Sequence, residues 1–291
     1  MKTFDDALRT KDFAISAEVY LRPEVDAASL CGQAEILKDY VDAILLTDNQ
    51  FGQLHMSTIA AASILLAEGI DPIVQLTCRN RNRIALISDL LGAAAIGVTS
   101  ILLMAGERAP PEFKPKPKPV LDLTATELIR TASMLNSDER LSNPSNFLVG
   151  GIVTPIIPKA SWKATKLTEK IEAGAQFVQT HICMDTRVLT AYMKHLVDKQ
   201  FIRRTSVIGA VAVIESAEDA EWLRDNRPSV NIPDELVGRL RSAADPRAEG
   251  ITICAETLRA IAGIPGMAGA NIIATRDLKT IPEAIREAGI T

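Results

Sequence analysis

Short apolar segments rich in β-branched residues recur along the chain, and each is separated from the next by room for about one helix. Such segments, bounded by turn-forming residues, are typical of β-strands. We expect eight strands, at residues 13–20, 43–48, 72–78, 100–106, 147–154, 177–184, 206–214 and 270–275. The intervening stretches, such as "NRIALISDLLGAAAIG" and "TRVLTAYMKHLVDKQ", show helical patterns of apolar residues.

Eight nearly all-apolar strands that alternate with helices predict an α/β protein with a (β/α)8 TIM barrel. A doubly wound open sheet is the alternative, but eight evenly spaced units favour closure. Residues 109–122, "APPEFKPKPKPVLD", are rich in Pro and Lys and predict an extended, mobile loop. Residues 226–263 predict two extra helices between the seventh and eighth strands. The length of 291 residues suits one barrel domain over residues 1–291.

Composition narrows the kind of partner. A net charge of −4 argues against nucleic acid, which would require a basic face. The chain opens without an apolar leader segment and has no apolar run of membrane-spanning length, so we expect a cytoplasmic protein without a membrane partner. The four cysteines are far apart and form no C-x-x-C, which indicates neither a disulfide scaffold nor a zinc finger.

In a barrel of this type the chemistry lies at the carboxyl ends of the strands. The polar residues expected there are Glu18, Thr47, Asp48, Asn49, Gln75, Glu107, His181, Asp185 and Arg276. Glu18 is unusual because it ends an apolar strand with no basic residue within three positions on either side. Burying an unpaired carboxylate costs free energy or raises its pKa, so an acid retained there suggests a catalytic role.

Several familiar sites are not supported by the sequence. No G-x-G-x-x-G follows the first strand, and no P-loop, H-E-x-x-H or G-x-S-x-G motif is present. His181 and Cys183 share one face of a strand, which could suggest a metal, but no third ligand is suitably spaced. We therefore expect no metal site.

Four segments resemble those of the methylenetetrahydrofolate reductase family and follow one another along the chain in the same order. "KIEAGAQFVQTHICMD" (170–185) is similar to the family's K-x-D-A-G-A-x-F-x-x-T-Q-x-x-F-D, and "QLTCRNRNR" (75–83) to its H-L-T-C stretch. "SAEVYLRP" is similar to S-F-E-x-x-P-P, and "VNIPDEL" to a late helix that begins I-P. The resemblance covers nearly the whole chain. It implies a flavoenzyme that reduces 5,10-methylenetetrahydrofolate to 5-methyltetrahydrofolate with NADH or NADPH, through non-covalent FAD.

The resemblance also implies roles for particular residues. Glu18 is the implied catalytic acid, and the implied folate-binding residues are Glu18, Asn49, Glu107 and His181. The implied flavin-binding positions are Thr47, Gln75, Ala105, Gly106, Glu107, Val153, Ile157 and Lys170. Glu18, Thr47, Gly106 and Lys170 match the family.

Other positions depart from it. Gln75 stands where the family has His, and Ala105-Gly106-Glu107 replaces Arg-Gly-Asp. His181 replaces a Gln that contacts the pterin, while Val153 and Ile157 replace a Tyr and a His. We therefore expect FAD to bind more weakly than in members with the full set, and an imidazole at position 181 to bring a pH-dependent group into the folate pocket.

Two other functions stay open at this point. A folate- or corrinoid-linked methyltransferase would share the barrel and the pterin pocket without needing flavin or nicotinamide. A catalytically silent partner subunit descended from a reductase would explain the departures. In each case the expected partners are small molecules, a folate and, for the reductase, a nicotinamide dinucleotide. The sequence is compatible with a homo-oligomer but does not indicate an oligomeric state.

Overall fold

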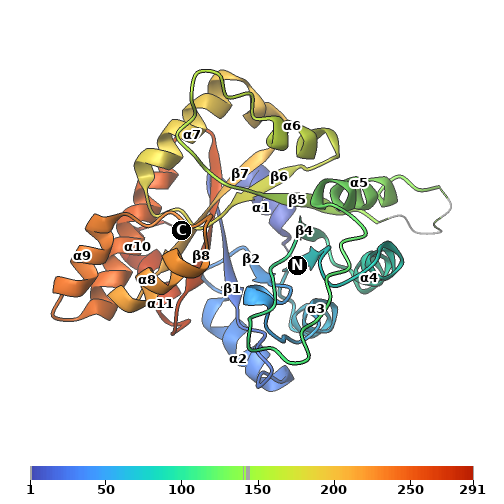
Figure 1. Cartoon of the computed structure of the whole chain (residues 1–291), viewed down its shortest axis with the longest axis horizontal. Helices are drawn as coiled ribbons and strands as arrows, with labels where there is room; N and C mark the ends of the chain where they lie inside the picture. The colour runs from blue at the N-terminus through green and yellow to red at the C-terminus, as the bar shows by residue number, and fades with distance from the viewer. Residues whose placement is uncertain (1, 140, 142–144, 291) are drawn as a thin grey trace.

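Eight parallel strands form a closed barrel in sequence order, surrounded by helices (Figure 1). The computed structural model describes residues 2–139, 141 and 145–290; residues 1 and 291, the ends of the expected domain, lie outside them. The strands are β1 (Ala14–Val19), β2 (Ala43–Leu46), β3 (Pro72–Thr77), β4 (Ser100–Met104), β5 (Leu148–Val153), β6 (Phe177–Thr180), β7 (Ser206–Val213) and β8 (Met267–Ala274). The predicted (β/α)8 TIM barrel is confirmed.

The helices follow the expected alternation, with additions at both ends of the chain. They are α1 (Phe4–Thr10), α2 (Ala27–Leu37), α3 (Thr58–Ala67), α4 (Arg83–Ile96), α5 (Ala125–Leu135), α6 (Thr165–Glu172), α7 (Thr186–Asp198), α8 (Ala217–Asn226), α9 (Asp234–Ser242), α10 (Pro246–Ala262) and α11 (Thr280–Ala288), with short 3₁₀ turns η1 (Gln50–Gly52) and η2 (Phe201–Arg203). The two helices predicted between the last two strands are α9 and α10. The sequence pattern did not predict α1 and α11.

The barrel interior is apolar at the end where the strands begin, and α1 closes this end. Phe4 from this helix meets Phe177 from β6 edge to face, with ring centroids 5.8 Å apart. The residues of this cluster are Phe4, Ala7, Ala14, Ala43, Leu45, Ile73, Leu102, Leu148, Phe177 and Ile208. Gly150 of β5 lies against the Phe177 ring, so that a Cβ at position 150 would overlap it. This end of the barrel is therefore a packed core.

Toward the carboxyl ends of the strands the inward-facing residues become polar. Because side chains alternate along a strand, Ala14, Ser16 and Glu18 of β1 share one face. Ser16 pairs in register with Ala43 of β2 and with Asn271 of β8, which closes the barrel. The change from apolar to polar residues places the hydrogen-bonding groups at one end of the barrel.

Residues 105–124, which contain the Pro- and Lys-rich insertion, form no helix or strand. The backbone N–H of Val120 donates to the carbonyl of Arg79 at 2.7 Å, which holds the far end of this loop beside the segment after β3. The expected loop is thus observed, while its extended course and its mobility stay predictions.

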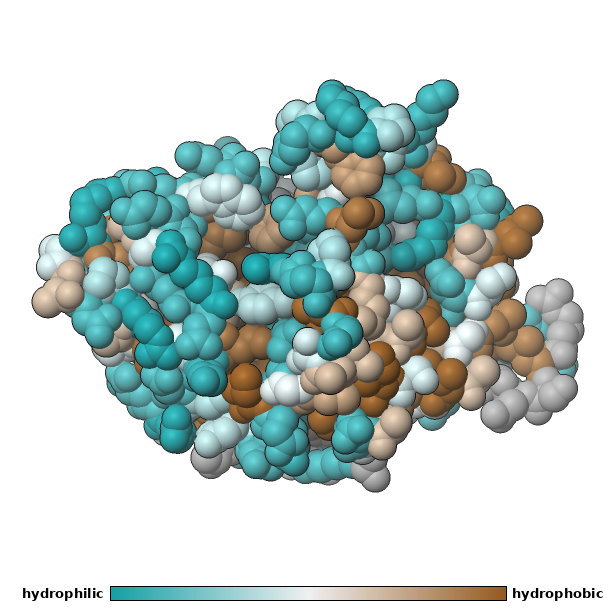
Figure 2. All heavy atoms as spheres, turned by 90° about the horizontal axis from the view of Figure 1, so that it is seen from below, coloured by the Kyte–Doolittle hydropathy of each residue, from teal (hydrophilic) through white to brown (hydrophobic). Residues whose placement is uncertain are grey.

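Figure 2 shows the side of the molecule on which α2, α3 and α4 lie, with apolar residues gathered on it. α3 contains no charged residue, and Ile84, Leu91 and Ile96 of α4 are exposed. Outer helix faces usually carry charged side chains. An uncharged face is compatible with a homo-oligomer, which stays a prediction. Within the described part of the chain, no helix is both long and apolar enough to cross a membrane.

Candidate active site

Glu18 lies inside the barrel at the end of β1, with a relative exposure of 6%. Its carboxylate accepts hydrogen bonds from Gln50 Nε2 at 3.0 Å and from Asn271 Nδ2 at 3.1 Å. Ser16 Oγ donates to Asn271 Oδ1 at 2.9 Å, which orients the Asn271 amide so that its N–H group faces Glu18. The acid is therefore held in place by residues from β1, η1 and β8.

Burial raises the pKa of Glu18 to about 7, because the low-dielectric interior disfavours the carboxylate. The positive charge of Arg227 and the hydrogen bonds from Asn271 and Gln50 act in the opposite direction. Glu18 is consequently near half-protonated at neutral pH, which is the condition a general acid requires.

A small cavity of about 60 Å³ lies above Glu18 at the mouth of the barrel. It is lined by Glu18, Thr47, Asp48, Asn49, Gln50, Gln75, Thr77, Met104, Gly106, Glu107, Ile152, Gln179, Thr180, His181, Ile182, Ala210, Arg227 and Ile273. Eight residues singled out from the sequence meet here: Glu18, Thr47, Asp48, Asn49, Gln75, Gly106, Glu107 and His181. The volume holds on the order of two water molecules and no heterocyclic ring.

The remaining positions implied by the resemblance do not line this cavity. Ala105 is exposed, and Ile157 is 65% exposed on the loop after β5. Val153 is buried, and its carbonyl accepts from the His181 backbone N–H at 2.8 Å. Lys170 is half-buried and lies against Gly151 of β5, on the side where α5 packs. Flavin contacts for these four residues stay predictions.

Three residues form a cover over the mouth: Phe51, Glu107 and Arg227. Glu107 accepts the backbone N–H of Phe51 and pairs with Arg227 Nη1 at 3.2 Å. The Arg227 guanidinium stacks on the Phe51 ring, 3.8 Å from its centroid. Phe51 has a φ of 59°, a left-handed conformation that is uncommon for a bulky residue. A ring-sized ligand can enter the barrel only if this cover moves.

His181 lies in the cavity, but not as the titrating group expected from its type. Burial, and then the neighbouring charge of Arg227, lower its pKa to about 4. The imidazole is therefore neutral at physiological pH, and the expectation of a pH-dependent group is corrected. Within the described part of the chain, no three His, Cys, Asp or Glu side chains are grouped so that they could hold a metal ion.

Asp48 belongs to the polar ring but is already fully paired. Arg81 contacts it through two nitrogens, at 2.6 and 2.9 Å, and Thr77 donates to it from both its backbone N–H and its hydroxyl. The Asp48 backbone N–H donates in turn to Gln75 Oε1 at 2.9 Å. These bonds join the ends of β2 and β3, so Asp48 acts as a structural residue.

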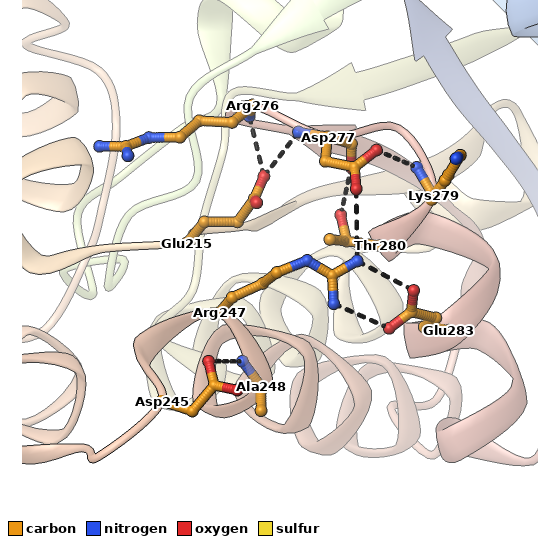
Figure 3. Close-up of polar contacts among 9 residues, drawn as sticks. All are labelled: Glu215, Asp245, Arg247, Ala248, Arg276, Asp277, Lys279, Thr280 and Glu283. Atoms are coloured by element: carbon orange, nitrogen blue, oxygen red, sulfur yellow. Dashed lines mark hydrogen bonds and ion pairs between the residues drawn. The ribbon is translucent and has the colours of Figure 1, made fainter.

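Asp185 and Arg276, also expected in the polar ring, lie outside the cavity. Asp185 caps α7 and pairs with Arg187 at 2.9 Å. Figure 3 shows the region after β8, where Glu215 accepts the backbone N–H groups of Arg276 and Asp277. The Arg276 side chain points away from Glu215 in this view, and it pairs with Asp219 at 2.8 Å. These contacts join the loops after β7 and β8.

Three residues important to the site were not identified from the sequence. Asn271 could have been recognised, since it is an amide in an apolar strand. It lies two residues before Ile273, which also faces the cavity. Gln50 follows the polar residues that end the second strand, but nothing local indicates that it reaches Glu18. Arg227 lies in the segment after α8, where an arginine is ordinary.

The fold and the site together define a barrel with a buried, protonatable carboxyl at its mouth, a class that includes many enzymes acting on small molecules. The family model described as methylenetetrahydrofolate reductase matches residues 3–267, so the chain belongs to this family. Membership supports an oxidoreductase of folate metabolism. A comparison with curated proteins gave no match.

Solved structures with the same fold were also found. One is an uncharacterized protein from Clostridium thermocellum that binds two copies of 5-methyl-5,6,7,8-tetrahydrofolic acid; it is 12% identical, with a TM-score of 0.69 over 98% of this chain and 96% of that chain. Another is 2,3-dimethylmalate lyase, a PEP mutase/isocitrate lyase superfamily member, 15% identical with a TM-score of 0.51 over 97% of this chain and 84% of that chain. At these identities the likeness shows the fold alone.

Proposed function

We propose that this protein reduces 5,10-methylenetetrahydrofolate to 5-methyltetrahydrofolate with NADH or NADPH, and that Glu18 is its general acid. The observation that carries the proposal is a buried carboxyl with a pKa of about 7 at the mouth of a barrel of this family. The likeness to a barrel that binds 5-methyltetrahydrofolate supports the same substrate class.

The chemistry requires such an acid. The methylene group of the substrate bridges two nitrogens, and one carbon–nitrogen bond must break before a hydride can reach the carbon. The leaving nitrogen takes a proton from Glu18, and the remaining nitrogen forms an iminium with the methylene carbon. Hydride from the dihydronicotinamide then converts this carbon to the methyl group, and Glu18 regains its proton from solvent.

The residues around the mouth fit a polar heterocycle. Thr47 lines the cavity, and its buried Oγ1 has no hydrogen-bond partner among the residues that the structure describes, so a ring carbonyl or ring N–H can satisfy it. FAD, when bound, would relay the hydride from nicotinamide to folate. We infer that it binds non-covalently near Thr47, Gln75, Gly106 and Glu107, after the cover has moved.

We further infer that the affinity for FAD is low. Val153 and Ile157 lack the rings of the family residues that they replace, and the loss of one stacking aromatic removes roughly 1 kcal/mol. Ala105 and Lys170 would contact outlying parts of the cofactor. Asn49, Glu107 and His181 would contact the folate; His181, being neutral, can both donate and accept a hydrogen bond.

A second function is favoured by one observation. Among the described residues that line the cavity, the only side-chain ring is the imidazole of His181, so no aromatic face is present for a flavin. A protein that binds methyltetrahydrofolate and transfers its methyl group, or a silent partner subunit, would need no such face.

The test uses the purified wild-type protein with 5,10-methylenetetrahydrofolate and NADH or NADPH, with and without added FAD. We expect oxidation of the nicotinamide that depends on the folate and forms an equal amount of 5-methyltetrahydrofolate. Absorbance changes during an FAD titration measure the affinity for flavin. If 5-methyltetrahydrofolate binds but neither nicotinamide is oxidised at saturating FAD, the reductase proposal is wrong and the second function is favoured.

A further inference from the structure

Arg227 is only partly paired within the protein. Its side chain is 15% exposed, and Nη1 pairs with Glu107 at 3.2 Å. Nε and Nη2 are buried and have no hydrogen-bond partner among the described residues. A buried donor without a partner is destabilising, and more so when the group is charged. Two such donors on one side chain therefore indicate that a partner binds there.

The two unpaired donors share one edge of the guanidinium. Nε and Nη2 point in nearly the same direction, and through this edge arginine binds one oxygen twice or two neighbouring oxygens together. The rest of the group is fixed, because Glu107 holds the opposite side and Phe51 packs against the flat face. Both nitrogens are buried, so an acceptor on a ring-sized ligand reaches this edge when the cover of Phe51, Glu107 and Arg227 opens.

The position of Arg227 limits which part of a ligand this acceptor belongs to. Arg227 lines the same small cavity as Glu18 and His181, and its charge lowers the pKa of both. Because Arg227 and Glu18 line one cavity of about 60 Å³, an acceptor that Arg227 binds in this cavity lies close to the Glu18 carboxyl. In a folate, the ring carbonyl of the reduced pterin meets this condition, whereas the carboxylates of the glutamate tail are remote from the reacting carbon.

We propose that Arg227, once the cover has opened, binds the ring carbonyl of the pterin through Nε and Nη2. This inference rests on the folate reaction proposed above and assigns one substrate contact within it. When the folate binds, its carbonyl satisfies the two free donors, and the ring is positioned relative to Glu18.

The test measures equilibrium binding without turnover. Wild type, Arg227→Lys and Arg224→Gln are each titrated with 5-methyltetrahydrofolate and with 6-methyltetrahydropterin, which lacks the aminobenzoyl-glutamate tail. Lys keeps the charge but cannot present two donors on one edge. Arg224 is the control, because it lies three residues before Arg227, in the last turn of α8, and pairs with Asp234 at the surface at 2.7 Å. Circular dichroism and thermal melting verify that each variant is folded.

We expect Arg227→Lys to raise the Kd of both ligands roughly 10- to 100-fold, the loss expected for charge-assisted hydrogen bonds. Arg224→Gln should change neither Kd by more than about twofold. An unchanged Kd in Arg227→Lys would overturn the inference, and so would a loss of affinity for the full folate alone, which would assign Arg227 to the glutamate tail. Absence of folate binding by the wild type would count against the proposed function itself and remove the basis for this inference.

Discussion

Replacing Glu18 with Gln should stabilise the protein, by an amount that depends on pH. The pKa of Glu18 is raised from 4.5 to about 7, so the folded protein takes up a proton that the unfolded chain does not hold between these pH values. The free energy of unfolding of the wild type therefore falls as the pH rises from about 4.5 to about 7, because the stabilising protonated form of Glu18 is lost. At about 1.36 kcal/mol per pH unit, this loss is about 3 kcal/mol.

Glutamine does not titrate and keeps the size of the side chain; its amide N–H₂ replaces one of the two acceptor oxygens, an effect on stability that does not vary with pH. The free energy of unfolding of Glu18→Gln, relative to the wild type, should thus increase by about 3 kcal/mol between pH 4 and pH 8. Urea unfolding of both proteins across this range measures the difference, in which other titrating groups cancel. A difference that does not vary with pH would refute the raised pKa, and with it the case for Glu18 as a proton donor.

Two further predictions concern the inside of the barrel. Because the pKa of His181 is lowered to about 4, His181→Gln should leave the pH dependence of folate binding between about 5.5 and 7.5 unchanged; a flatter profile in titrations of the variant would show that the imidazole titrates there. Gly150→Ala should lower the free energy of unfolding by about 1–3 kcal/mol, because the new methyl group overlaps the Phe177 ring. Gly209→Ala on β7, where the nearest atom to a new Cβ is 3.4 Å away, is the control and should cost clearly less in the same urea unfolding; equal costs would show that overlap with Phe177 is not the cause.

The strands were predictable because each one has a local signature. The apolar runs identified all eight, and the main error was the length of β6, expected to reach residue 184 but ending at Thr180. After Thr180 the chain still makes bonds that resemble a strand: Cys183 forms an isolated bridge with Asn231 and takes the carbonyl of Ala210 as acceptor. An apolar run cannot reveal where regular pairing stops.

The helix α1 was missed because its stability comes largely from tertiary contacts. α1 has only seven residues, too few for a stable isolated helix. It is held by its Thr3–Asp6 capping box, by Phe4 in the barrel core and by Asp71, which accepts the Phe4 backbone N–H at 2.7 Å. The capping box is local, but Asp71 is 67 positions from Phe4 and Phe177 is more distant still, so no short window of sequence contains these tertiary contacts.

The residues of the site at the strand ends were predictable, but their hydrogen-bond partners were not. The rule that chemistry lies at the strand ends identified Glu18, Thr47 and His181 as residues of one cavity. The partners of Glu18 could not be derived in this way, because Asn271 is 253 positions away and Gln50 reaches the acid from a 3₁₀ turn. The same reason applies to Arg227, whose place over the mouth follows from the path of the chain after α8.

The role of Glu18 as the acid that opens the folate ring is tested most directly by stopped-flow measurement of the two hydride transfers in FAD-loaded protein. Glu18→Gln is compared with wild type and with Asp71→Asn, which alters a buried acid at the opposite end of the barrel. Reduction of FAD by NADH or NADPH requires no proton from Glu18, so Glu18→Gln should leave it near normal and slow the reduction of 5,10-methylenetetrahydrofolate at least ~10²-fold. Asp71→Asn should leave both steps unchanged. Equal slowing of both steps by Glu18→Gln, or folate reduction at the wild-type rate, would contradict the account.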